Sequence, residues 1–249
     1  LLENFDAVPV GTVLRVSAIK GEDTVLVGDF DNFADGWNAA IEEALTNNYD
    51  RIVVDFYADW VATKGEFCDD GKGFSYDAIY IPENARVTLN LNGHTIDRGL
   101  TDDEDDGEVI FINDDADVII NNGTITGGYS NSEGGCLYIE GGANVTLNDV
   151  HIVGNKVYND DGAGVYMYGG SKLTVNGGSF ENNTTNGNGW ATYYGGAVYV
   201  EEGTVFVMGD NRSDSGDSRS MRIGLVDTRR ILGKVVVRVT PFSRFGKVN

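Results

Sequence analysis

The chain has 249 residues and is 41% hydrophobic, which is enough to bury the core of one large or two small domains. Its formal net charge of −21 excludes general nucleic-acid binding, because that function requires a basic surface. No run of about 18 apolar residues occurs, so no membrane-spanning helix is predicted within the chain.

The charge is divided unevenly along the sequence. Segment 204–249 has nine Lys/Arg and four Asp/Glu residues, for a net charge of +5, whereas residues 1–203 carry −26. A change of sign this sharp indicates two segments of different origin. We therefore expect three parts, at 1–30, 31–203 and 204–249.

The first part of the chain is predicted to be a β segment of two or three strands, which could end an upstream module. A helix is predicted over 33–45, because apolar residues recur there at helical spacing, with Asp31 or Asn32 as its N-cap. We expect this helix to cap the following unit, since the first coil of a stacked fold exposes apolar interior and unpaired edges. The apolar face of the predicted helix consists of Trp37, Ala40, Ile41, Ala44 and Leu45.

A repeat of about 28 residues occupies the middle of the chain. Its first motif recurs in steps of 31, 27 and 28 residues, at Val87, Val118, Val145 and Leu173. Its second motif recurs in steps of 27, 28 and 33 residues, at Ile110, Leu137, Val165 and Val198. A third short strand follows the first motif in each unit, at 95–96, 124–125, 151–152 and 179–180. Strands this short cannot bury a face alone but stacked coils can, so the repeat predicts an all-β fold, a right-handed parallel β-helix.

The run from Ile79 to Asp97, IYIPENARVTLNLNGHTID, supports the same fold. It resembles the pectate-lyase-like β-helix domains of bacterial surface proteins, and the resemblance covers residues 30–203. It implies an extracellular or cell-surface location. It implies no particular activity, because no catalytic set typical of such polysaccharide-cleaving enzymes is recognisable.

Acidic residues cluster between positions 102 and 117, and no Lys or Arg occurs between Arg98 and Lys156. The polysaccharide lyases of this fold use Ca²⁺ on carboxylates together with a basic group, and that base is missing from these coils. We interpret the cluster as a solvated turn, with weak Ca²⁺ binding as the alternative and no other cofactor. The candidate Ca²⁺ ligands are Asp102, Asp103, Asp105, Asp114, Asp115 and Asp117.

An aromatic position recurs in the second motif. Tyr138, Tyr166 and Tyr199 occupy equivalent sites on successive coils, which predicts that their rings stack as a ladder. An inward ladder would be part of the core. An outward ladder, together with Trp190, could stack sugar rings of a glycan or contact a cell-surface partner.

The segment 204–249 contains the most specific motif of the chain, VFVMGDNRSDSGDSR, from Val205 to Arg219. With its surroundings, Glu202–Lys247, it resembles the C-terminal region of bacterial type I signal peptidases. The residues that carry the resemblance are Gly209, Asp210, Asn211, Arg212, Ser215, Asp217, Ser218 and Arg219.

Type I signal peptidases are membrane-bound serine endopeptidases in which a neutral Lys deprotonates the nucleophilic Ser. The resemblance implies that Ser215 orients this Lys, that Asp217 and Arg219 form a structural ion pair, and that Asp210 beside Asn211 holds the Lys-bearing strand. The sequence has no Ser-Met-x-Pro-Thr-like segment and no Lys-Arg strand followed by a Pro-Gly-Asp turn. No catalytic Ser or Lys is therefore identifiable, and we expect the chain not to cleave signal peptides.

The start of this segment has an alternative interpretation. Residues 203–209 align with 171–177, so the first strand after residue 203 could extend the stack of coils.

Three functions follow from these patterns. The first is a non-catalytic surface β-helix that binds a glycan or a surface partner, fused to a signal-peptidase segment without the dyad. The second is a signal-peptidase-related serine endopeptidase, which would be located at the cell membrane. The third is a polysaccharide lyase or hydrolase dependent on Ca²⁺ at the acidic cluster.

Overall fold

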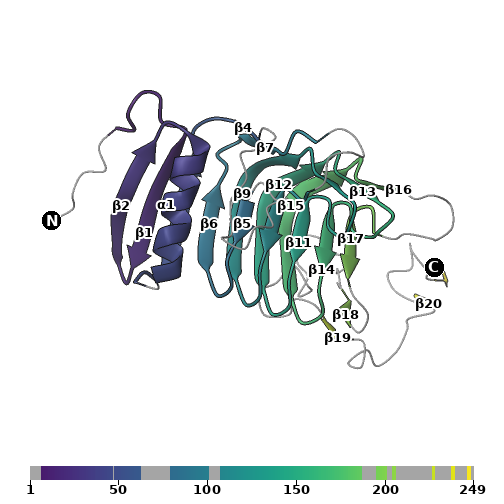
Figure 1. Ribbon diagram of the computed structural model, residues 1–249. Helices are drawn as coiled ribbons and strands as arrows, with labels where there is room; N and C mark the ends of the chain where they lie inside the picture. The colour runs from purple at the N-terminus through teal and green to yellow at the C-terminus, as the bar shows by residue number, and fades with distance from the viewer. Residues whose placement is uncertain are drawn as a thin grey trace.

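The computed structural model describes residues 7–46, 48–62, 79–100, 107–186 and 195–200, together with four two-residue strands nearer the C-terminus. The described chain is mostly β and contains a β-solenoid of about 4 turns and one helix (Figure 1). The β-solenoid agrees with the predicted β-helix.

The N-terminal unit consists of a helix and three antiparallel strands. Strand β1 (Leu14–Lys20) lies between β2 (Asp23–Phe30) and β3 (Arg51–Phe56) and is antiparallel to both. Helix α1 (Phe33–Thr46) connects β2 to β3 and contacts all three strands. It begins as predicted, because the side-chain oxygen of Asn32 accepts a hydrogen bond of 2.8 Å from the Asp35 amide.

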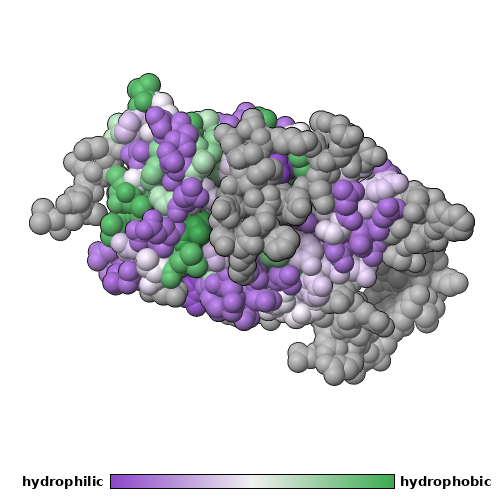
Figure 2. Space-filling view, viewed as in Figure 1, coloured by the Kyte–Doolittle hydropathy of each residue, from purple (hydrophilic) through white to green (hydrophobic). Residues whose placement is uncertain are grey.

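The helix packs closely against the strands. Trp37 and Ala40 are buried, as the predicted apolar face requires. A Cβ on Gly36 would lie 3.0 Å from a methyl carbon of Leu14, so glycine permits this close approach. Leu45, by contrast, is 58% exposed, because it lies in the last turn of the helix, beyond the strands. Figure 2 shows hydrophobic residues on this N-terminal unit, where Val25, Leu26 and Leu45 are exposed.

The coils of the solenoid stack in parallel register. The largest sheet has the order β15-β12-β9-β6-β3-β1-β2, with β4 and β7 paired beside it; a second has the order β17-β14-β11-β8-β5; and a third has the order β10-β13-β16. The strands of the first sheet not yet given are β4 (Trp60–Val61), β6 (Arg86–Asn90), β7 (Thr95–Asp97), β9 (Asp117–Thr126), β12 (Asn144–Val153) and β15 (Lys172–Glu181). Those of the second are β5 (Ile79–Ile81), β8 (Ile110–Ile112), β11 (Leu137–Ile139), β14 (Val165–Met167) and β17 (Val198–Val200). Those of the third are β10 (Tyr129–Ser130), β13 (Lys156–Tyr158) and β16 (Thr184–Asn186).

The predicted register is confirmed in these sheets. Val118 pairs with Val145, and Val145 pairs with Leu173. Each complete coil has three strands, as predicted, but two of the three are formed by other residues than expected. The first and third motifs are continuous in β9, β12 and β15, where the chain bends at residues with positive φ, such as Asn122 (φ 49°). The third sheet was not predicted at all.

Inward side chains form one continuous hydrophobic core. Along β9 and β12, alternate residues such as Val118, Ile120, Val145 and Leu147 are buried, and the residues between them are half-buried or exposed. This period of two is what one buried sheet face requires.

The first strand after residue 203 does not extend the stack. Strand β18 (Thr204–Val205) pairs antiparallel with β19 (Val226–Asp227), in a sheet separate from β15. For these two described residues, the pairing differs from the one that the alternative interpretation expected. Strand β20 (Val237–Arg238) likewise pairs antiparallel with β21 (Gly246–Lys247).

Candidate functional site

One aromatic ring from each strand of the second sheet forms a ladder along the solenoid. Its members, which we call the aromatic ladder, are Tyr80, Phe111, Tyr138, Tyr166 and Tyr199. Successive ring centroids are 5.7, 4.9, 5.4 and 5.1 Å apart, with interplanar angles of 11–20°. The predicted stacking of the three tyrosines is thus observed. The ladder follows the order of strands visible in Figure 1.

The ladder is on the outer face of the sheet. In β11, Leu137 and Ile139 point into the core and are fully buried, whereas Tyr138 between them is half-exposed. Tyr166 is the most enclosed ring, at 6% exposure, because Tyr168 packs edge-on against it with a centroid distance of 5.7 Å. An outward ladder is the arrangement for which the sequence predicts contact with a glycan or a cell-surface partner.

Stacking limits how this face can contact a ligand. Phe111, Tyr138 and Tyr166 each have a neighbouring ring on both sides, so their ring faces are turned toward other rings. What they direct outward are ring edges and, for the tyrosines, hydroxyl groups. A sugar ring can therefore stack only at the ends of the ladder, and hydrogen bonding is the main chemistry along its length.

Polar groups surround the ladder hydroxyls. The Asn113 amide donates a hydrogen bond of 2.7 Å to the Tyr80 hydroxyl. Burial, followed by the charge of Glu140, raises the pKa of the Tyr138 hydroxyl, and Tyr168 and Glu133 act in the same direction. The Tyr138 hydroxyl thus stays protonated, and it shares a side-chain hydrogen bond with Tyr168.

Sequence reasoning missed two members of the ladder. Phe111 lies in the second motif at the position of Tyr138, and Tyr80 is one coil earlier between Ile79 and Ile81. The signal was present in both cases, since each is an aromatic residue between two buried apolar ones. Trp190, the fourth predicted contact, lies outside the residues that the structure describes.

The acidic candidates are not brought together where the structure describes them. Asp114 and Asp115 are exposed in a turn, whereas Asp117 forms an ion pair of 2.8 Å with Arg51. Within the described part of the chain, no three His, Cys, Asp or Glu side chains lie close enough to hold a metal ion. Three further candidates, Asp102, Asp103 and Asp105, fall outside that part.

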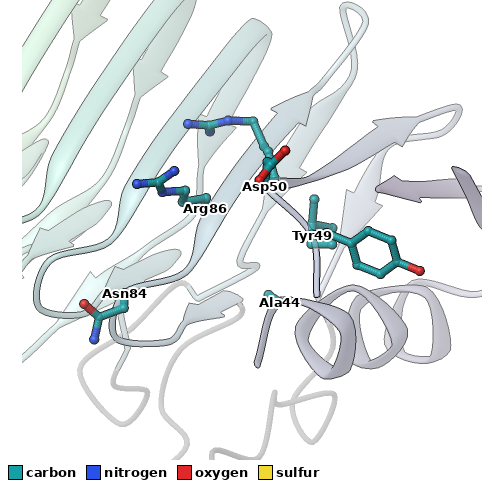
Figure 3. Close-up of a pocket in the computed structure, with 7 residues that line it drawn as sticks. Ala44, Tyr49, Asp50, Asn84 and Arg86 are labelled. Carbon is teal, nitrogen blue, oxygen red and sulfur yellow. The ribbon is translucent and has the colours of Figure 1, made fainter. Parts of the chain in front are cut away.

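A cavity of about 300 Å³ lies between α1 and the first coil, and no member of the aromatic ladder lines it (Figure 3). Asn84 and Arg86 lie on one side and Tyr49 and Asp50 on the other. The lining of the cavity carries charges of both signs. Arg86 is exposed, and the Asp50 carboxylate accepts a hydrogen bond of 2.6 Å from the Gly21 amide. None of the residues predicted to be functional lines this cavity.

The signal-peptidase-like motif lies outside the described residues, so no geometry is available for Gly209, Asp210, Asn211, Arg212, Ser215, Asp217, Ser218 and Arg219. Their assignment stays a prediction from the sequence.

Comparison with known proteins identifies relatives of the chain. The family model described as signal peptidase, peptidase S26, matches residues 106–240. A probable signal peptidase I-1 of Synechocystis sp. is 44% identical over 52 residues, which are 21% of this chain and 26% of that protein. Signal peptidase I of Bacillus licheniformis is 44% identical over 54 residues, or 22% and 28%. Signal peptidase I of Bacillus caldolyticus is 46% identical over 50 residues, or 20% and 26%.

The chain spans only about a quarter of the length of these curated relatives. No solved structure matches it. Among the described residues, no helix has the length and apolar character needed to cross a bilayer.

Proposed function

We propose that this chain, which belongs to the signal peptidase family, peptidase S26, is a bacterial surface protein whose solenoid serves as a binding module. In this proposal the solenoid binds a glycan without cleaving it, and segment 204–249 is a signal-peptidase segment without its own dyad. In the same proposal, the coils wind in a right-handed sense and α1 caps the first coil.

The aromatic ladder is the observation that carries the proposed binding function. It places five rings in one row on the outer face of the sheet, and all of them except Tyr166 are partly exposed. Each strand beneath it is held by parallel pairing to its neighbours, so the row is preorganised before a ligand arrives. Among the described residues, no group of three or more His, Cys, Asp or Glu side chains could hold a metal ion.

Screening the full chain on a glycan array tests this proposal, with product analysis of every polysaccharide that binds. We expect at least one extended glycan to bind and to remain uncleaved. Cleavage of a polysaccharide by a chain that binds no glycan on the array would contradict the proposal and support the lyase or hydrolase function.

The family match favours a second candidate, a serine endopeptidase that processes signal peptides at the cell membrane. Here Ser215 would orient the general-base Lys, and the Asp217–Arg219 ion pair would hold the surrounding loop. The reaction requires a Ser hydroxyl and a neutral Lys amine within hydrogen-bond reach of each other. Neither residue is identifiable in this sequence, which is why the binding function is ranked first.

A cleavage assay separates the two candidates. The full chain is incubated with a signal-peptide-bearing substrate in detergent micelles, beside an intact signal peptidase I as positive control. The binding function predicts no cleavage by the chain. Cleavage that the Ser215→Ala variant slows would establish the endopeptidase instead.

A further inference from the structure

The outer face of the second sheet indicates which class of glycan it accepts. We propose that the aromatic ladder and the carboxylates beside it bind an amine-bearing, positively charged linear polysaccharide, running along the axis of the solenoid. This inference rests on the proposed function, because it names the ligand of the same binding module.

Charge is the first argument. Glu140 directly follows β11, two residues after Tyr138, so the alternation of side chains places both residues on the outer face. Glu133 precedes the same strand, and both carboxylate side chains are half-exposed. The sequence has no Lys or Arg between Arg98 and Lys156, so the described coils 107–155 contain no cationic side chain of these two types. Along these middle coils an acidic polysaccharide would be repelled by the carboxylates, whereas a protonated amine would be attracted to them.

Spacing is the second argument. The ladder offers one aromatic side chain per coil at centroid separations of 4.9–5.7 Å, which is comparable with the length of one sugar ring in a linear chain. A tyrosine hydroxyl has one donor and two acceptor positions, so a partner within the protein leaves further positions for a ligand. Phe111 is the one ladder member without a hydroxyl, and it interrupts the row between Tyr80 and Tyr138.

The third argument favours a sugar polymer over a basic peptide. The strands under the ladder are paired with neighbours on successive coils, so the middle of this face has no free strand edge to which a peptide backbone could add. Recognition must come from side chains that point outward, and these are hydroxyls and carboxylates. Such groups match the repeated hydroxyl and amine groups of an amino-sugar chain.

Calorimetric titration of the full chain with three hexasaccharides at physiological salt tests the inference. The probes are hexamers of glucosamine, of N-acetylglucosamine and of galacturonate. We expect the glucosamine hexamer to bind about tenfold more tightly than the acetylated one, and the galacturonate hexamer not to bind. Tighter binding of galacturonate would overturn the inference.

Four variants locate the binding. Tyr138→Phe keeps the ring and the net charge, and should weaken glucosamine-hexamer binding about two- to tenfold through loss of one hydroxyl. Phe111→Tyr completes the row and should tighten binding. Glu140→Gln should weaken binding about two- to fivefold, whereas Glu42→Gln on α1, which changes net charge equally, should leave it unchanged.

Several results would overturn the inference. Equal weakening by Glu42→Gln and Glu140→Gln would mean attraction to overall negative charge only. If neither Tyr138→Phe nor Phe111→Tyr changes the affinity for the glucosamine hexamer, the ligand binds elsewhere. Equally tight binding of hexalysine, weakened by the same variants, would identify a basic peptide as the partner. If no amine-bearing sugar binds but another glycan does, the proposed function survives and this inference fails.

Discussion

Two columns of side chains run along the solenoid, and they differ in how their members contact one another. The asparagine column consists of Asn90, Asn121, Asn148 and Asn176. The side-chain amide of each donates a hydrogen bond of 2.7–2.8 Å to the member one coil earlier, and Asn90, the first member, donates to Asp55. The aromatic ladder also repeats once per coil, but its members contact one another by ring stacking, and the Tyr80 hydroxyl bonds to Asn113, outside the ladder.

The difference separates stability from binding. In the middle of the asparagine column, each side chain uses its amide NH₂ as a donor to one neighbour and its amide oxygen as an acceptor from the other. These bonds satisfy polar groups that the stacking of the coils partly buries. Stacking in the ladder contributes about 0.5–1.5 kcal/mol for each ring pair, but it leaves hydrogen-bonding positions for a ligand. We therefore expect substitutions in the asparagine column to lower stability, and hydroxyl substitutions in the ladder to alter binding.

Breaking the asparagine column at its middle should have the largest effect on stability. Asn148→Ala removes one bond to Asn121 and one from Asn176, so the free energy of unfolding should fall by about 1–3 kcal/mol. Urea denaturation measures the change. Asn144→Ala is the matched control on the same strand, because Asn144 is exposed and its amide makes only a 3.4 Å bond to Gly142. Equal losses in the two variants would show that the column contributes nothing particular.

Changing the end of the column should have a smaller effect. Asp55→Asn keeps an oxygen that can accept the Asn90 amide but removes the negative charge, so we expect a loss of about 0.5–1 kcal/mol. Asp55→Ala, which removes the acceptor, should cost more in the same urea titration. If Asp55→Asn is the more damaging change, the carboxylate has a role beyond accepting this bond.

Asp59, which lies outside both columns, should make a small contribution to stability that depends on pH. The Thr95 amide and, secondarily, His94 lower the pKa of Asp59. A carboxyl whose pKa is depressed by folding stabilises the protein above its ordinary pKa, and this contribution is lost as pH falls below about 4. Asp59→Asn should therefore be less stable than the unmodified chain at pH 6, and the difference should shrink toward pH 3. A difference that does not vary with pH would contradict this.

Calcium should have the smallest effect. If the six candidate ligands between Asp102 and Asp117 bind no Ca²⁺, millimolar Ca²⁺ leaves the melting temperature unchanged. An equal concentration of Mg²⁺ controls for ionic strength. A rise with Ca²⁺ alone would favour the alternative, a weak Ca²⁺ site.

The sequence predicted the register of the apolar repeat but missed the strands that have no apolar pattern. The steps between Val118, Val145 and Leu173 fixed the register, because stacked coils place equivalent residues side by side. Strands β10, β13 and β16 had no apolar pattern of their own, and stacking of the flanking coils creates their pairing. The contact between His94 and Asp59 joins two turns with no shared motif.

The signal-peptidase motif shows a different limit. Its residue order identifies a family, but it does not predict how the segment pairs. Alignment alone suggested a further coil, whereas β18 pairs with β19 instead. Two-residue strands carry too little periodicity to distinguish these outcomes.

Comparing Tyr138→Phe with Asn148→Ala in the same two measurements tests the division between the columns most directly. The measurements are affinity for the glucosamine hexamer and free energy of unfolding of the full chain. We predict that Tyr138→Phe weakens binding and changes stability by less than about 1 kcal/mol, whereas Asn148→Ala lowers stability and leaves affinity unchanged. Weaker binding in Asn148→Ala, or unchanged binding in Tyr138→Phe, would contradict the assignment of binding to the aromatic ladder.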